Sequence, residues 1–384
     1  MRLGITCYPT HGGSGVFATE LGKQLALRGH TISFISYSAP LRLVELPPRV
    51  TFHEVQAGEY PLLKQYPYTL ALAAKMVEVA AANELQILHV HYAIPFSPAA
   101  ILARQMAPEL DLKVVTTLHG TDTSLVGAAP YFHPVTRFSI EQSDAVTTVS
   151  EYLRRETADT FQVTRPIEVI PNCVDLDHYA ASHPLPAGRA GAAPKQVLHI
   201  SNFRPVKRAA DVIEVFARIR RRVDARLLLV GDGPDLSRAL ALARQLEVAS
   251  DVTTVGVVDD VAPFLQAADL LLLPSASESF GLVALEAMAS QVPVVASRTG
   301  GLPEVVPDGR AGYLLPPGAV DAMAARAVDL LTDEKLHRRC GSAGREQAKN
   351  FSCDTVVPRF EAFYQRVLSQ PSAPTLIRAP AVGT

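Results

Sequence analysis

The chain has 384 residues, of which 48% are hydrophobic and 19% are charged, so it carries enough apolar material for large cores and is not a disordered protein. Its formal net charge is -2, from 36 basic and 38 acidic residues, which gives no electrostatic reason to expect a nucleic acid as partner. The first residues are typical of a strand rather than a signal peptide, and no apolar run is long enough for a membrane span.

Strand-like and helical patterns alternate along the first half of the chain. Apolar runs typical of buried parallel strands occur at 3–7, 31–37, 87–91, 113–117, 145–149 and 167–170. Helical stretches lie between them, for example at 15–28, 69–84 and 133–142. This alternation predicts βαβ units, and therefore a parallel sheet covered by helices.

The pattern restarts after a segment rich in Pro, Gly and Ala at 183–194, which we interpret as an interdomain linker. Strands are predicted at 197–200, 227–230, 252–255, 270–273 and 294–296, and helices at 209–222, 236–246, 281–289 and 320–331. We therefore expect domains at 1–182 and 195–351, a helix at about 352–368 that packs back on the first domain, and a mobile tail at 369–384. The fold class is α/β, with two doubly wound domains facing across a deep cleft.

The cysteines and histidines do not show the sequence spacing of a metal site. Four cysteines, at positions 7, 173, 340 and 353, are scattered without paired spacing, which favours a reduced, cytoplasmic setting. His89 and His91 share one face of a predicted strand and could suggest zinc, but no third ligand has a recognisable spacing. We therefore expect neither a metal nor another cofactor.

Two loops at strand ends carry groups suited to anions. Gly12, Gly13 and Gly15 surround Ser14 between the first strand and its helix, where free N–H groups and the helix dipole favour an anion, although a plain tight turn would show the same residues. Arg204 and Lys207 follow the first strand of the second domain and could clamp a diphosphate, or could be ordinary surface cations.

The stretch from Glu278 to Glu286 is the most specific element. Glu278 closes a loop after a buried strand, Gly281 and Leu282 would begin a helix, and Glu286 lies roughly 12 Å further along it. Two carboxylates at that distance could bind hydroxyls at both ends of an extended ligand, with helix-start amides on a phosphate between them. Two exposed helix carboxylates are the alternative interpretation.

With the stretches ESFGLV, EAMA, PVVAS and TGGLPEVV, this element resembles the retaining glycosyltransferases of the GT-B fold, family four, through about residue 368. The resemblance implies that Glu286 binds the nucleotide ribose, that Glu278 contacts the transferred sugar, and that Arg204 and Lys207 hold the diphosphate. It also implies donor contacts from the glycine loop, the base pocket and the helix start, at Gly13, Val257, Phe280, Gly281 and Leu282.

Stretches of the first half, such as TTLHGTDTSLVG and HVHYAIP, are similar to the branch of that family that serves the first step of bacillithiol synthesis. That branch transfers N-acetylglucosamine from UDP-N-acetylglucosamine to the hydroxyl of L-malate. The resemblance implies an acceptor pocket formed by Ser14, Tyr92, Thr117, Arg137 and Asn172. Arg137 can offer a bidentate fork to a carboxylate.

The resemblance also places His119 near the reaction centre, where we expect it to orient the sugar and stabilise charge; the neighbouring Asp122 could fix its tautomer. Catalytic groups are then His119, Glu278, Arg204 and Lys207. Retention of configuration follows from the resemblance alone, and a homodimer is left open.

Three alternative functions remain open at this level. The first is transfer to another acceptor, such as an inositol phosphate or a lipid sugar. The second is an isomerase similar to UDP-N-acetylglucosamine 2-epimerase, which would consume the donor without an acceptor. The third is a sugar-nucleotide-binding regulator without turnover.

Overall fold

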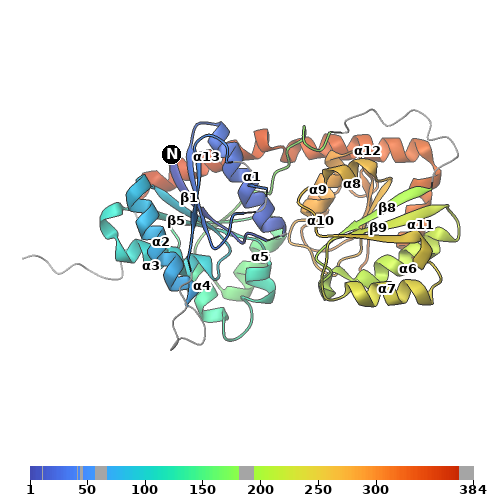
Figure 1. Ribbon diagram of the computed structural model, residues 1–384, viewed down its shortest axis with the longest axis horizontal. Coiled ribbons are helices and arrows are strands. Elements are labelled where there is room, and N and C mark those ends of the chain that lie inside the picture. The colour runs from blue at the N-terminus through green and yellow to red at the C-terminus, as the bar shows by residue number, and fades with distance from the viewer. Residues whose placement is uncertain (11, 41, 44–45, 57–66, 181–193, 372–384) are drawn as a thin grey trace, which may run out of the picture. The chain divides into compact units, whose positions relative to one another are not determined.

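The computed structural model describes residues 1–10, 12–40, 42–43, 46–56, 67–180 and 194–371 (Figure 1). The chain forms two compact units: an N-terminal unit of Met1–Pro171, joined by the chain from Val357 onward, and a C-terminal unit of Asn172–Val356. The predicted linker at 183–194 lies outside the described residues except for its last position. The predicted tail at 369–384 lies outside them from residue 372 onward.

The N-terminal unit contains a parallel sheet of seven strands in the order β3-β2-β1-β4-β5-β6-β7. The strands are β1 (Arg2–Thr6), β2 (Thr31–Ser36), β3 (Val50–Glu54), β4 (Ile87–His91), β5 (Lys113–Leu118), β6 (Ala145–Thr148) and β7 (Ile167–Val169). The helices are α1 (Gly13–Leu27), α2 (Tyr68–Asn83), α3 (Phe96–Met106), α4 (His133–Gln142), α5 (Glu151–Phe161) and the long α13 (Cys353–Ser369).

The C-terminal unit repeats the design with six parallel strands in the order β10-β9-β8-β11-β12-β13. They are β8 (Lys195–Ile200), β9 (Ala225–Val230), β10 (Val252–Gly256), β11 (Leu270–Leu273), β12 (Val294–Ser297) and β13 (Gly312–Leu315). The helices are α6 (Ala209–Arg220), α7 (Leu236–Gln245), α8 (Ala262–Ala267), α9 (Leu282–Ala289), α10 (Leu302–Val305), α11 (Val320–Thr332) and α12 (Glu334–Ala348), with α6 and α7 on one face of the sheet (Figure 1).

The predicted fold class is confirmed, since both units are doubly wound parallel sheets. Strands β4 and β11 are buried along their whole length; β11 is apolar throughout, whereas β4 also contains the buried residues His89 and His91. Strands β3 and β13 were not predicted. Each is a short strand at the edge of its sheet, where partial exposure weakens the apolar signal. Within the described residues, no helix is long and apolar enough to cross a membrane.

The change of unit lies at Pro171, earlier than the predicted boundary after residue 182. The segment that begins at Asn172 belongs to the C-terminal unit because it is bonded there: Val174 pairs with Ser352, and the hydroxyl of Tyr179 donates to Glu286. The second crossing lies within α13, after Val356. Beyond that point α13 packs on the N-terminal unit, where Phe360 contacts Phe17 of α1.

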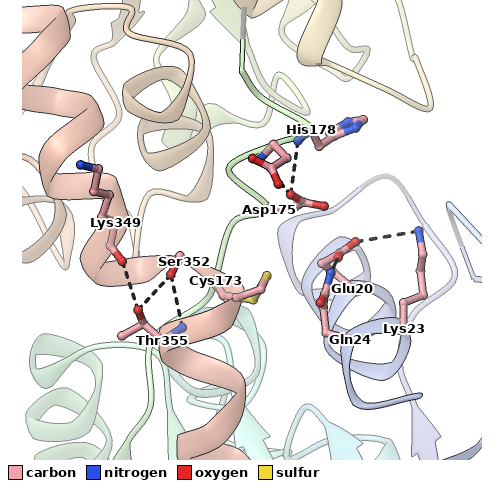
Figure 2. The surroundings of a disulfide bond; sticks show 11 residues. Glu20, Lys23, Gln24, Cys173, Asp175, His178, Lys349, Ser352 and Thr355 are labelled. Atoms are coloured by element: carbon pink, nitrogen blue, oxygen red, sulfur yellow. Dashed lines mark hydrogen bonds and ion pairs between the residues drawn. A yellow bond between two sulfur atoms is a disulfide. The ribbon is translucent and has the colours of Figure 1, made fainter. Parts of the chain in front are cut away.

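A disulfide joins Cys173 to Cys353, whose Cα atoms are 4.9 Å apart (Figure 2). This differs from the expected reduced setting. The two cysteines are 180 residues apart in sequence, and backbone bonds of Val174 to the segment around Ser352 bring them together. A rule based on the local spacing of cysteines cannot predict such a pair. The other two, Cys7 and Cys340, are buried free thiols.

The disulfide closes a loop that contains almost the whole C-terminal unit. The cross-link closes a loop of about 180 residues and thereby lowers the conformational entropy of the unfolded chain. Reduction restores that entropy and should lower the free energy of unfolding of this unit by roughly 5 kcal/mol in the chain-entropy treatment. Urea unfolding with and without dithiothreitol measures this shift. The Cys173→Ser/Cys353→Ser double variant is the control and should not respond to the reductant; an equal response would contradict the assignment.

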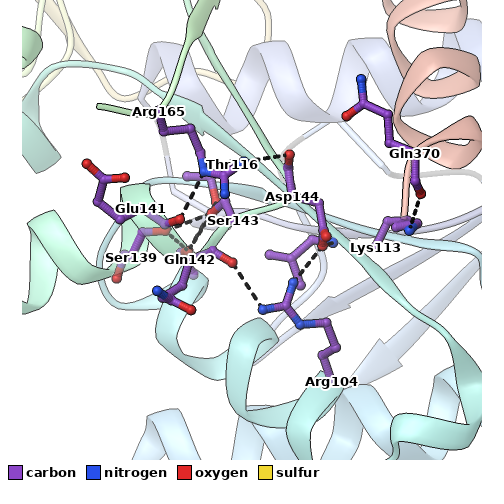
Figure 3. Close-up of polar contacts among 12 residues, drawn as sticks. Arg104, Lys113, Thr116, Ser139, Glu141, Gln142, Ser143, Asp144, Arg165 and Gln370 are labelled. Carbon is purple, nitrogen blue, oxygen red and sulfur yellow. Dashed lines mark hydrogen bonds and ion pairs between the residues drawn. The ribbon is translucent and has the colours of Figure 1, made fainter. Parts of the chain in front are cut away.

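A buried ion pair joins α3 to β6 in the N-terminal unit (Figure 3). Nη1 of Arg104 donates to Oδ2 of Asp144 over 2.6 Å, and the two side chains are only 6% and 5% exposed. The same carboxylate oxygen accepts the backbone N–H of Val114, and Nη2 of Arg104 donates to the carbonyl of Gln142. This pair therefore ties α3, β5 and the start of β6 together.

Removal of Arg104 leaves the buried carboxylate of Asp144 without its cation. Arg104→Met should therefore lower the free energy of unfolding by about 3–5 kcal/mol. Arg366→Met is a matched control, since Arg366 pairs with Glu168 while both side chains are largely exposed, and it should cost less than about 1 kcal/mol. If denaturant unfolding showed the same loss in free energy of unfolding for both variants, burial would not increase the contribution of the Arg104–Asp144 pair to stability.

Candidate active site

The strand order of the C-terminal unit reverses between β8 and β11, so the loops that follow these two strands lie next to each other. Ligands of open parallel sheets bind at such a switch point, outside the carboxyl ends of the strands. Arg204 and Lys207 come from the loop after β8, and Glu278 from the loop after β11. We call these residues, together with Ser275, Gly281 and Glu286, the C-terminal site.

An ion pair forms the centre of the C-terminal site. Nζ of Lys207 lies 2.6 Å from Oε1 of Glu278, and the hydroxyl of Ser275 donates to the same oxygen over 2.8 Å. The sequence predicts that both charged residues contact a ligand, but neither their pairing nor the contact from Ser275 can be predicted from it. Both interactions use Oε1, and no hydrogen bond to the second oxygen of Glu278 is found among the residues that the structure describes.

Arg204 lies on the same loop as Lys207, after β8, and is only partly exposed. Its Nε is buried and has no hydrogen-bond partner in the described part of the chain. A guanidinium N–H that is hidden from water without an acceptor is costly, and an anionic ligand would supply the acceptor. Together, Arg204 and Lys207 bring two cations to one strand end.

Glycines allow the loops of the C-terminal site to touch. A Cβ atom on Gly300 would lie 1.8 Å from the carbonyl oxygen of Glu278, and the N–H of Gly301 donates to that carbonyl. Gly281 has a φ of 96° and precedes the first residue of α9, Leu282, without a side-chain cap. The first N–H groups of α9 are therefore free of helical partners and suited to an anion.

Glu286 is on α9 and is 4% exposed. The hydroxyl of Tyr179 donates to its Oε1 over 2.6 Å. Sequence reasoning missed Tyr179, because 107 residues separate it from Glu286. Two other residues of the predicted donor set differ in exposure: Phe280 is buried against Phe351, whereas Val257 is exposed after Gly256.

The N-terminal unit has its own switch point, between β1 and β4. Gly13 begins α1 and is exposed, and the hydroxyl of Ser14 donates to the phenol oxygen of Tyr92 over 3.0 Å. Tyr92 has a φ of 107°, and its N–H bonds the carbonyl of Thr117. We call these residues, together with His119, the N-terminal site.

Asp122 organises the turn that carries His119. Its carboxylate accepts the backbone N–H groups of His119, Gly120 and Ala93, over 3.1, 2.9 and 2.8 Å. Among the described residues the bonds of the Asp122 carboxylate go to the backbone, and none to the imidazole of His119 is found, so the expectation that Asp122 fixes the tautomer gains no support. The ring of His119 instead bonds His91, whose Nδ1 lies 2.9 Å from its Nε2.

The remaining predicted acceptor residues are not equally placed. Thr117 is fully buried, with its hydroxyl bonded to His89 and Thr147, so a direct ligand contact would require these bonds to be exchanged. Arg137 is exposed on α4. Asn172 is buried in the C-terminal unit, and its Oδ1 has no partner within the described ranges.

Among the described residues, the structure brings no third metal ligand to His89 and His91. The Nδ1 and Nε2 atoms of His89 bond the hydroxyls of Tyr364 and Thr117. Over the residues that the structure describes, no group of three or more His, Cys, Asp or Glu side chains is arranged to hold a metal ion.

Two tandem Rossmann-like units, each with polar groups at its switch point, define the GT-B class. The family description Glycosyltransferase Family 4 matches residues 11–178, and Glycosyl transferases group 1 matches residues 188–347. The chain is 46% identical to N-acetyl-alpha-D-glucosaminyl L-malate synthase of Bacillus anthracis, over 96% of this chain and 97% of the relative.

A second relative is GDP-mannose-dependent alpha-(1-6)-phosphatidylinositol monomannoside mannosyltransferase of Mycobacterium tuberculosis, 34% identical over 76% of this chain and 79% of the relative. Among solved structures, sucrose-phosphate synthase from Thermosynechococcus elongatus aligns with a TM-score of 0.77 at 23% identity, covering 96% of this chain and 99% of the other. The chain thus belongs to the GT-B glycosyltransferase family that includes N-acetyl-alpha-D-glucosaminyl L-malate synthase, and it is a glycosyltransferase.

Acid should slow this enzyme through Asp122. Burial raises the pKa of Asp122 from 3.8 to about 6, so acidification below 6 protonates a carboxylate that holds the His119 turn. The rate of glycosyl transfer should fall as the pH drops through about 6, and Asp122→Asn should lack this inflection. Because the folded pKa is the higher one, protonation of Asp122 favours the folded state, so the fall would not reflect unfolding through this group. A rate that is flat across pH 6 would contradict the assignment.

Proposed function

We propose that this glycosyltransferase transfers N-acetylglucosamine from UDP-N-acetylglucosamine to the hydroxyl of L-malate, with retention of configuration. The observation that carries the proposal is the 46% identity to N-acetyl-alpha-D-glucosaminyl L-malate synthase over 96% of the chain. A match of that extent includes the N-terminal unit, where the proposal puts the acceptor.

The chemistry of the C-terminal site supports a sugar nucleotide as donor. Arg204, Lys207 and the amides at the start of α9 would stabilise negative charge on the departing diphosphate. Glu278 would bind a sugar hydroxyl through its second oxygen, and Glu286 would bind the ribose. Arrival of a diphosphate would give Lys207 a second anionic partner beside Glu278.

The reaction forms a bond between the malate hydroxyl oxygen and the anomeric carbon and breaks the bond from that carbon to the phosphate oxygen. The proton of the malate hydroxyl passes to the departing phosphate, on the same face of the sugar. Ser14, Tyr92 and Arg137 would hold malate, which is a dianion and suits the free N–H groups at the start of α1.

A second candidate is transfer to an amphiphilic acceptor. It is favoured by the mannosyltransferase relative, whose name specifies phosphatidylinositol monomannoside, and by exposed aromatic side chains near Arg137 in the sequence. Tyr131 is 76% exposed, and Phe132 and Phe138 also reach solvent. Such a surface could accept an apolar tail.

The test is UDP release from UDP-N-acetylglucosamine with and without L-malate in the presence of EDTA, with the product identified by mass. Release that depends on malate and yields an N-acetylglucosaminyl malate mass supports the proposal. Release without malate would indicate hydrolysis or epimerisation. Transfer to phosphatidylinositol monomannoside in place of malate would favour the second candidate. Glu278→Gln should bind UDP but lose roughly 100-fold in turnover.

Lys207→Ala should weaken UDP binding roughly 10- to 100-fold, because it removes a cation from the diphosphate and leaves the negative charge of Glu278 beside it without a cation. Lys195→Ala is the matched control. Lys195 begins the same strand, β8, and pairs with Asp269 at the opposite end of the sheet. Titration calorimetry that gives equal affinities for both variants would remove Lys207 from the nucleotide site.

A further inference from the structure

Two imidazoles form a direct hydrogen bond at the N-terminal site. His91 is the last residue of β4, and His119 follows the neighbouring strand β5. The Nδ1 atom of His91 lies 2.9 Å from the Nε2 atom of His119. Such a bond contains a single proton between two nitrogens, so it links the tautomer of one ring to that of the other.

Both rings are neutral at physiological pH. Burial lowers the pKa of His119 to about 3 and holds that of His91 well below its ordinary value. The shared proton then resides on one nitrogen, with two arrangements open. Either Nδ1–H of His91 donates to His119, or Nε2–H of His119 donates to His91.

The other ring nitrogen of His91, Nε2, decides between these two positions of the proton. Its Nε2 is buried and has no hydrogen-bond partner in the described part of the chain. If that nitrogen carried the proton, a buried N–H would be left without an acceptor, whereas a bare lone pair at the same place is tolerated better. The proton of His91 is therefore on Nδ1, and His91 donates to His119.

The residues around the two rings offer no competing partner for this hydrogen bond among those that the structure describes. His89 lies against His91 with ring centroids 4.3 Å apart, but both its nitrogens already bond Tyr364 and Thr117. Phe17 of α1 contacts both His91 and His119, which excludes water from this side. The carboxylate of Asp122 accepts the backbone N–H of His119.

We propose that His91 is a positioning residue that fixes His119 as the tautomer with its proton on Nδ1. His119 then presents an N–H donor to an oxygen of the bound sugar and has no free lone pair with which to take the proton of the acceptor. The Nδ1 atom of His119 is suited to this role because it has no bonded partner among the described residues and is not among the fully enclosed polar atoms. The inference rests on the proposed function for the identity of the sugar.

Nitrogen-15 NMR of histidine-labelled protein tests the tautomer directly. The signals are assigned with the His91→Asn and His119→Asn variants. We expect His119 to carry its proton on Nδ1 in the wild-type protein. A proton on Nε2 of His119 would overturn the inference. This measurement needs neither substrate nor turnover, so it is independent of the donor and acceptor.

Kinetics of two variants separate positioning from packing. His91→Asn keeps an N–H donor close to the place of Nδ1 and should retain turnover within a few-fold of wild type. His91→Leu has a similar volume without a donor, and it should lower kcat at least roughly tenfold while the affinity for UDP is unchanged. Equal kcat values for the two variants, each with wild-type unfolding behaviour, would contradict the role of His91. A wild-type Nδ1–H tautomer without malate-dependent turnover would refute the proposed function and leave the tautomer assignment in place.

Discussion

A parallel sheet that is buried on both faces can offer polar side chains to a ligand only at the ends of its strands. Both units of this protein obey that constraint. Strands β4 and β11 are apolar or buried throughout, and the residues with chemistry follow immediately after them or their neighbours. The strand order then determines which loops meet, because it reverses once in each sheet. The two sites are therefore consequences of the sheet topology.

The two sites have opposite electrostatic characters. In the C-terminal site, the two cationic side chains of Lys207 and Arg204 and the carboxylate of Glu278 lie partly exposed. In the N-terminal site, burial removes charge, since the imidazoles of His89, His91 and His119 all have lowered pKa values. A neutral network of directed hydrogen bonds suits recognition of hydroxyls, whereas the cations suit a diphosphate.

The division of the chain at Pro171 also has a physical basis. The segment after it carries Cys173, Val174 and Tyr179, each of which has a partner in the C-terminal unit. Sequence composition located the boundary at the Pro- and Gly-rich stretch because composition reports flexibility. Membership of a unit depends instead on where backbone and side-chain bonds are made.

The sequence by itself determined the fold class, the central strands and the loops that carry Arg204, Lys207, Glu278 and His119. Periodicity and the alternation of elements are local properties, and a parallel sheet places its strand ends by rule. Only the tertiary structure decided which side chains pair: Lys207 with Glu278 and Ser275, Tyr179 with Glu286, His91 with His119, and Cys173 with Cys353. Most of these pairs join residues far apart in the chain, so no spacing rule predicts them. Whether a buried polar atom has a hydrogen-bond partner, and whether burial shifts the pKa of a side chain, depends on elements that lie far away in the sequence. A local pattern does not contain those elements.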